Sequence, residues 1–192
     1  MFDSNRSQTK HLRFFLRDFR MVEARVAVAE GQSLSSCLAH RKSYINLQDA
    51  HWSSTGERVE HAVLKIEQVL WAAALDPDLP LVNAALATPR AVDLQLDGGL
   101  QLRAGLNTGE RQRLGDYLES AGAFIALRNA ILLRSGRPPR KANVVLGDVV
   151  VNQAAIQAVW EVASNPGEFA PRDFNDGDPF TGIPDLDAQH VE

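Results

Sequence analysis

Apolar and polar residues alternate in two stretches of the chain that lie 80 residues apart. In the first stretch every second residue is apolar, at Leu12, Phe14, Leu16, Val22, Ala24, Val26 and Val28. Residues 92–106 repeat this pattern, and Asp97, Gly98 and Gly99 interrupt it in the middle. A period of two is typical of strands that bury one face, and Asp-Gly-Gly is typical of a tight hairpin. Each stretch therefore predicts a pair of antiparallel strands.

A short helix of about two turns is predicted after each pair of strands, because two leucines follow at a spacing of four residues. These leucines are Leu34 with Leu38, and Leu114 with Leu118. Apolar runs that end at Trp52 and Leu132 then predict a third strand in each stretch. Residues 62–74 and 149–161 each resemble two short strands joined by a tight turn. The order is strand, strand, helix, strand, strand, strand, and it occurs twice.

The two stretches also agree position by position, which predicts an internal duplication. Residues 21–52 align with 101–132 without a gap, and 8 of the 32 positions are identical. Beyond this region the offset grows from 80 to 87, so that 62–74 aligns with 149–161. The additional residues fall in the segment "LRSGRPPRKANVV", as expected for an insertion in a surface loop.

Five short strands with one helix cannot cover both faces of a flat sheet, so each copy is expected to curve strongly or to form a small barrel. We predict a mainly β (α+β) protein of two tandem, internally duplicated curved-sheet or barrel domains, each with one short helix, and an extended acidic tail. The predicted parts are an N-terminal arm (1–10), a first β-domain (11–74), a Pro-rich connector (75–90), a second β-domain (91–163) and the tail (164–192). Exposed edges of the two copies could pair with each other and form a pseudo-twofold body.

The shared residues form a sequence signature. Both copies contain L-x-x-[CY]-L followed by [YF]-I-x-L-x-[DN]-A, and the second copy adds an apolar-N-x-x-x-I pattern in "VVVNQAAI". This order resembles a widespread family of small, functionally uncharacterised bacterial β-domains, and it is similar to Sm-like and SH3-like barrels in architecture. The resemblance covers about 12–74 and 91–163, although Lys65 stands where the second copy has Asn152. It implies a fold and assigns no catalytic residue.

Composition narrows the class of protein. The chain has 192 residues, 45% of them hydrophobic, which favours a globular protein over a disordered one. No apolar run approaches the roughly 18 residues that span a bilayer, so we expect no membrane span. Cys37 is the single cysteine, which excludes an internal disulfide and favours a cytoplasmic protein. The formal net charge is −4, and the acidic residues concentrate after Asn165.

Residues that carry chemistry are sparse, and we expect no enzyme, no cofactor and no metal site. His51 and His61 flank a predicted hairpin and could face each other, but neither belongs to a metal-binding spacing. Cys37 lies on a predicted helix between two leucines, where a structural role is expected. An enzyme with a site between the domains would need a convergent set of polar residues, and the sequence contains none.

Two basic clusters and a set of aromatic residues are the candidate partner-binding sites. Arg134, Arg137, Arg140 and Lys141 lie in the inserted loop, and the N-terminal segment carries Arg6, Lys10, Arg13, Arg17, Arg20 and Arg25. Phe169, Phe174 and Phe180 recur through the acidic tail and suggest a segment that docks by burying its rings. The alternatives are solvated charges in the loop and a disordered terminus.

The preferred interpretation is a non-enzymatic interaction or assembly protein, a scaffold or accessory subunit of a bacterial complex, with a protein partner or a second copy of itself. The alternative is a nucleic-acid-binding small barrel that uses the basic loop 134–141 and an acidic regulatory tail. The fold prediction requires a buried core made of Leu34, Leu38, Ile45 and Leu47 with their equivalents Leu114, Leu118, Ile125 and Leu127.

Overall fold

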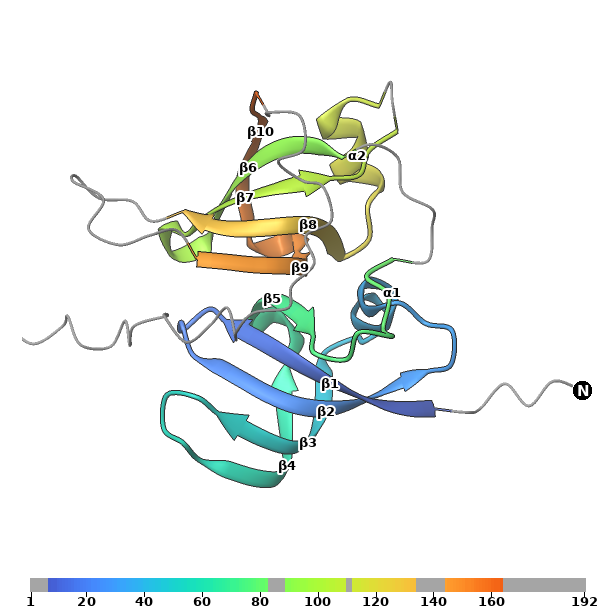
Figure 1. Ribbon diagram of the computed structural model, residues 1–192, viewed down its shortest axis with the longest axis vertical. Helices are drawn as coiled ribbons and strands as arrows, with labels where there is room; N and C mark the ends of the chain where they lie inside the picture. Colours follow the sequence, from blue (N-terminus) through green and yellow to red (C-terminus); the bar gives the residue numbers. More distant parts are fainter. Residues whose placement is uncertain (1–6, 83–88, 110–111, 134–143, 164–192) are drawn as a thin grey trace, which may run out of the picture.

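The strands of the protein form one antiparallel sheet, which two short helices accompany (Figure 1). The computed structural model describes residues 7–82, 89–109, 112–133 and 144–163. The first half contains β1 (Ser7–Leu16), β2 (Met21–Ala29), α1 (Leu34–Ala39), β3 (Tyr44–Trp52), β4 (Arg58–Lys65), the short 3₁₀ turn η1 (Ile66–Gln68) and β5 (Val69–Ala74). The second half contains β6 (Arg90–Leu96), η2 (Asp97–Gly99), β7 (Gln101–Leu106), α2 (Leu114–Ser120), β8 (Phe124–Leu133), β9 (Val144–Asn152), η3 (Gln153–Ala155) and β10 (Ile156–Glu161).

The predicted order of strands and helices is confirmed in each half. Both helices begin at the leucine that the spacing predicted, Leu34 and Leu114. The expected hairpin at Asp97 turns through Gly98 and Gly99, and both have a φ of 74°, which glycine adopts without strain. The first strand begins at Ser7, so part of the segment that we assigned to an N-terminal arm belongs to β1. The predicted acidic tail lies outside the described residues.

The ten strands have the order β10-β6-β7-β8-β9-β5-β1-β2-β3-β4 in a single open sheet. Within each half the order is therefore the same: fifth strand, first, second, third, fourth. In the described part of the chain no pairing joins β4 to β5 or β9 to β10, so neither half closes into a barrel of its own. The barrel alternative of the fold prediction is therefore not seen in the described residues, and an open edge of one half instead forms hydrogen bonds with the other half.

The halves are joined by β5 and β9, which pair antiparallel with Trp71 opposite Val151 and Ala72 opposite Val150. This pairing joins the fifth strand of the first half to the fourth strand of the second half. A twofold axis would instead pair a strand with its own equivalent. The expected pseudo-twofold body is therefore wrong, and the halves are joined head to tail.

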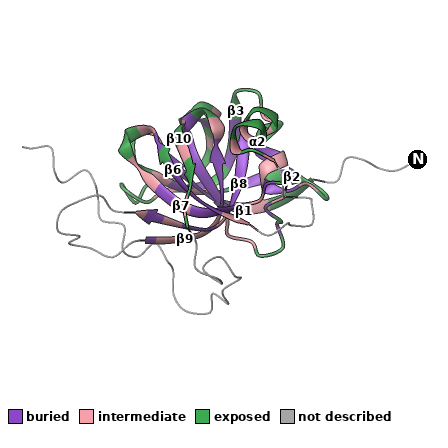
Figure 2. Cartoon of the chain, turned by 90° about the horizontal axis from the view of Figure 1, so that it is seen from above, coloured by how far each residue is buried: buried purple, intermediate pink, exposed green. Residues whose placement is uncertain are grey.

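Buried residues concentrate in the central strands (Figure 2), and their apolar side chains form two clusters. Strand β5 contributes to both clusters: Val69 and Ala72 belong to the first, whereas Leu70, Trp71 and Ala73 belong to the second. A strand that is buried on both faces needs apolar residues at consecutive positions. This double burial explains why the period of two disappears in the run "VLWAA".

Most of the predicted core residues are buried. Leu34, Leu38, Ile45, Leu47, Ile125 and Leu127 are all at most 2% exposed. Leu114 and Leu118 were predicted to be buried as well, but both are only half-buried at the surface of the second cluster.

The first helix is covered by the chain that follows β5, which explains the difference between the two helices. The backbone N–H of Leu34 donates to the carbonyl of Pro80 at 2.9 Å, and Leu79 and Leu81 belong to the first cluster. The first turn of α1 is also capped by Ser33, whose hydroxyl accepts from the N–H of Ser36 at 3.3 Å. In the described residues α2 has neither a side-chain cap nor such a covering segment.

An ion pair recurs at one equivalent position of the two halves, with its charges exchanged. Arg13 of β1 lies opposite Glu23 of β2, and 80 residues later Asp93 of β6 lies opposite Arg103 of β7. In the first pair the guanidinium and carboxylate are 2.5 Å apart, and in the second Nε and Nη2 of Arg103 donate to Asp93 at 2.8 and 3.0 Å. This position therefore holds a pair of opposite charges in both halves, and the two halves carry the signs in opposite order.

A backbone feature also recurs at an offset of 80. Asp49 in β3 and Asn129 in β8 have φ values of 49° and 47°, and the strand pairing shifts its register beside each of them. Asp and Asn are the non-glycine residues that adopt this left-handed conformation most readily. The [DN]-A element of the sequence signature thus marks a β-bulge in both halves.

No helix in the four described ranges has the length and apolar character needed to cross a membrane.

Candidate interface: the junction of the halves and the free edges of the sheet

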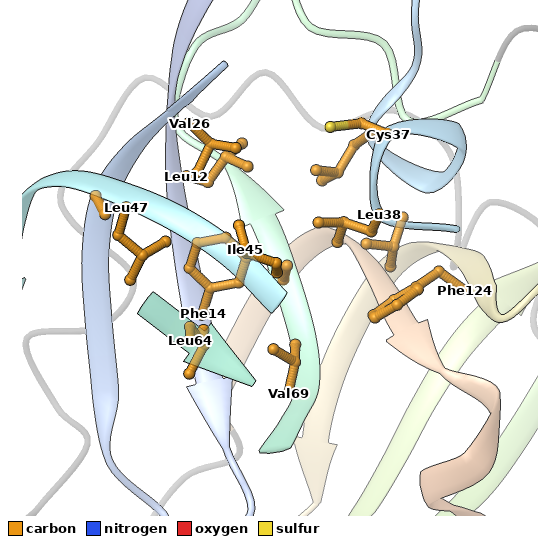
Figure 3. Close-up of a cluster of buried hydrophobic side chains, with 14 of the residues drawn as sticks. Leu12, Phe14, Val26, Cys37, Leu38, Ile45, Leu47, Leu64, Val69 and Phe124 are labelled. Atoms are coloured by element: carbon orange, nitrogen blue, oxygen red, sulfur yellow. The ribbon is translucent and has the colours of Figure 1, made fainter. Parts of the chain in front are cut away.

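The junction between the halves is held by side chains that cross into the neighbouring core. Phe124, Ala126 and Val150 come from the second half and belong to the first cluster. Figure 3 shows Phe124 next to Leu38, at the border of the first cluster. In the opposite direction the crossing residues are Phe15, Leu70, Trp71 and Ala73, all in the second cluster. The rings of Phe15 and Trp71 stack at 4.1 Å with an interplanar angle of 11°.

Asn152 is the central polar residue of the junction. It is buried at the end of β9, and its amide Nδ2 donates to the carbonyls of Val69 at 3.0 Å and Ile66 at 3.4 Å in the first half. Its Oδ1 accepts from the backbone N–H of Ala154 at 3.1 Å. Asn152 therefore ties the η3 turn of its own half to the η1 turn of the other.

Arg17 makes a second polar connection between the halves. Its Nε donates to the carbonyl of Glu67 at 2.6 Å, and its guanidinium forms an ion pair with Asp97 of the second half. Because the carboxylate lies in the hairpin between β6 and β7, this ion pair fixes the end of β1 against that hairpin.

The sheet has two free edges, β4 in the first half and β10 in the second, and each pairs with a neighbour on one side only within the described residues. Of the four large apolar side chains that are exposed in the described part of the chain, two lie on these edge strands and a third lies on the strand beside one of them. Val63 is in β4, Tyr44 is at the start of β3 opposite Lys65 of β4, and Trp160 is in β10. The fourth, Phe19, lies in the hairpin between β1 and β2.

The exposed residues of the β4 edge are the equivalents of residues that the junction buries. At the offset of 80, Tyr44 corresponds to Phe124, and their exposed fractions are 58% and 5%. At the offset of 87, Val63 corresponds to Val150, and the fractions are 65% and 0%. The β4 edge therefore carries the same kind of apolar surface as β9, but among the described residues no strand pairs with its outer side.

The β10 edge has the same relation to β5. Trp160 corresponds to Ala73, with exposed fractions of 39% and 6%, and Ala158 corresponds to Trp71. Positions two apart on a strand share a face, so the large ring stays on the same face and moves two positions along it. Other positions are more polar at the free edges than at the junction: Asn46 replaces Ala126, Gln95 replaces Phe15, Gln157 replaces Leu70 and Lys65 replaces Asn152.

The site residues that the sequence analysis proposed are not placed at these edges. Arg134, Arg137, Arg140, Lys141, Phe169, Phe174 and Phe180 all lie outside the described residues. The basic residues of the N-terminal segment, where described, each form an ion pair within the chain. These pairs are Lys10–Asp78, Arg13–Glu23, Arg17–Asp97, Arg20–Asp18 and Arg25–Asp49. The hydrogen bond from Lys10 holds the pKa of Asp78 below its usual value.

The candidates for chemistry are also separated. His51 lies opposite Arg58 and His61 opposite Gln48, so the two histidines do not face each other. Burial raises the pKa of the Cys37 thiol, which keeps this side chain protonated in the core. Across the part of the chain that the structure describes, no three His, Cys, Asp or Glu side chains gather as metal ligands would.

Comparisons of the chain with family models, with curated proteins and with solved structures give no match. Tyr44, Val63 and Trp160 are not among the site residues predicted from the sequence. The signal was available in the alignment of the copies, which sets Tyr44 beside Phe124 and Val63 beside Val150. The alignment alone does not show which residue of each equivalent pair is buried. Only the pairing of β5 with β9 shows that Phe124 and Val150 are the buried ones.

Proposed function

We propose that the chain is a non-enzymatic interaction or assembly protein, built from two copies of one small β-unit, that binds protein partners at its free edges β4 and β10. It would serve as a scaffold or accessory subunit of a larger complex. The observation that supports this proposal is the location of Tyr44, Val63 and Trp160, three exposed large apolar side chains, at the two ends of the sheet.

The physical basis is strand addition. An edge strand presents unpaired N–H and C=O groups, and an incoming strand gains affinity from main-chain hydrogen bonds and specificity from side chains of alternate residues. Soluble proteins usually protect such edges with charges, and β4 carries Arg58, Glu60, His61 and Lys65. Tyr44 and Val63 are exceptions to this protection, as expected for positions that a partner covers.

Capture of partners from the native source with edge variants tests this proposal. Val63→Glu places a charge on the β4 edge, and Trp160→Glu places one on the β10 edge. Ala27→Glu adds the same charge to an exposed position of β2, which lies between β1 and β3 in the sheet. We expect proteins that co-purify with the wild-type chain to be lost with one or both edge variants and retained with Ala27→Glu. Identical sets of partners, including an empty set, from the wild type and the edge variants would refute the proposal.

A further inference from the structure

We infer that the partner of one edge is the other edge of a second copy: β10 of one chain pairs with β4 of the next, in the arrangement that β5 and β9 have within the chain. This inference rests on the proposed function and names its partner. The equivalence of the strands is the first argument, because the offset of 87 relates β5 (69–74) to β10 (156–161) and β9 to β4. The two free edges, β4 and β10, are therefore the equivalents of the two strands that pair at the junction, β9 and β5.

The register of this contact follows from the junction. Trp71 lies opposite Val151 and Ala72 opposite Val150. Applying the offset of 87 to each strand places Ala158 opposite Leu64 of the second copy, and Val159 opposite Val63 of the second copy. Continuing the antiparallel register places Glu161, which pairs with Arg90 of its own chain, opposite His61 of the second copy.

The half-buried helix α2 supplies the second argument. At the junction Phe124 belongs to the same cluster as Leu38 of α1, and both are buried. The equivalents are Tyr44 and Leu118, and both are incompletely covered. When a second copy pairs its β4 with β10, its Tyr44 takes the place of Phe124 and lies against α2. One contact thus covers the exposed tyrosine and the exposed side of the helix together.

Lys65 supplies the third argument. It occupies the position of Asn152, whose amide donates to two backbone carbonyls across the junction. The same offset makes the carbonyls of Gln153 and Ile156 of the first copy the equivalents of these acceptors for Lys65 of the second copy. An ammonium group has three donors and can satisfy both carbonyls. The replacement of Asn by Lys therefore preserves the donor and adds a charge that keeps the free edge soluble.

A contact between unlike edges of identical chains is heterologous, so repeated addition closes into a ring or extends as a filament. The more polar positions of the free edges, Asn46, Gln95 and Gln157, make this contact weaker than the junction. We therefore expect an assembly that depends on protein concentration, with the internal junction intact at every concentration.

A pair of engineered cysteines tests the register. Cα atoms of opposite residues in an antiparallel pair are about 4.5–5.5 Å apart, which is within the range of a disulfide. Val63→Cys in one chain and Val159→Cys in another should form an interchain disulfide when the two variants are mixed under mild oxidation. Val63→Cys mixed with Trp160→Cys is the matched control, because these side chains are one residue out of register and point to opposite faces. Equal cross-linking in the two mixtures would contradict the inferred register.

Mixing two edge variants of the full chain tests the polarity of the assembly. Val63→Glu blocks only the β4 edge and Trp160→Glu only the β10 edge. In a head-to-tail contact each variant alone is monomeric, at 21.1 kDa, and an equimolar mixture forms a heterodimer of twice that mass, which cannot grow further. In a twofold contact one variant alone would still dimerise through its intact edge. Light scattering after size exclusion distinguishes these results, with circular dichroism and Ala27→Glu as controls for folding.

The wild-type chain should show a mass that rises with concentration beyond the dimer. A monomer at all soluble concentrations, or dimers of a single variant, would overturn the self-association. If partners from the native source are nevertheless lost with the edge variants, the proposed function stands and only its identification with a second copy fails. If the edge variants change neither self-association nor partner binding, both proposals fail.

Discussion

At the scale of single residues, Asn152 and Lys65 occupy equivalent positions with opposite surroundings. Asn152 is buried and bonded to Val69 across the junction, whereas Lys65 is exposed at the free edge. Asn152→Ala should lower the free energy of unfolding by about 1–3 kcal/mol, because it removes the buried amide that donates to the carbonyls of Val69 and Ile66 across the junction. Lys65→Ala should change it by less than about 0.5 kcal/mol in the monomer. Urea denaturation of both variants measures the difference, and equal effects would contradict the role of Asn152.

The ion pair with exchanged charges gives a second prediction at this scale. Asp93 is buried, and Arg103→Gln removes the guanidinium that donates to both of its oxygens. The loss should be about 1.5–3 kcal/mol, the range for hydrogen bonds to charged groups. The double variant Asp93→Arg with Arg103→Asp should recover part of it, because Arg13 and Glu23 show that the fold accepts this order of charges. A double-mutant cycle in which the two changes add without coupling would exclude the pairwise requirement.

Cys37 gives a prediction that depends on pH. Burial raises the pKa of its thiol in the folded state, so the native protein holds this proton more tightly than the unfolded chain does. The resulting contribution to stability is complete below the ordinary thiol pKa of about 8.5, and it is lost as the pH rises toward the higher value of the folded state. Denaturation between pH 7 and 10 should show a decline that Cys37→Ser lacks. Alkylation at pH 8 should require unfolding, and rapid labelling of the native chain would contradict the burial.

At the scale of elements, the two helices have the same leucine spacing but different depths of burial. Leu38 is fully buried and Leu118 only half-buried. Leu38→Ala should cost about 2–5 kcal/mol, the range for a core cavity, and Leu118→Ala less than about 2 kcal/mol in the monomer. Thermal or urea denaturation at low protein concentration provides the comparison. Similar costs for the two variants would show that α2 is as deeply packed as α1.

At the scale of the whole molecule, the two halves form one continuous sheet through the pairing of β5 with β9. Strand β5 places side chains in both clusters, so unfolding of the first half would also remove β5 side chains from the core of the second half. Leu47→Ala in the first half should therefore lower the opening free energy of β7 in the second half by the same amount as that of β2. Hydrogen exchange followed by mass spectrometry measures both strands in one sample. An unchanged β7 would mean that the halves unfold independently.

The local elements could be predicted because they depend on neighbours in the sequence. Alternation at Leu12, Phe14 and Leu16 fixes which face of a strand is apolar, whatever it packs against, and the leucine spacing at 34 and 38 does the same for a helix turn. The runs 69–73 and 149–151 contained a further signal, because consecutive apolar residues indicate burial on both faces. Their pattern predicts short strands, and only the structure shows that β5 and β9 are the edges of the two halves that pair.

The sequence alone determined the strands, the two helices, their order and most of the core, because side-chain periodicity and turn residues act over a few positions. The tertiary structure alone decided that β5 pairs with β9, that the halves follow one another head to tail, and that Leu114 and Leu118 stay half-buried. Pairing of edge strands is made by backbone groups that every residue except proline carries, so the side-chain pattern does not record which edges meet. For the same reason only the structure could distinguish the covered Phe124 and Val150 from the exposed Tyr44 and Val63.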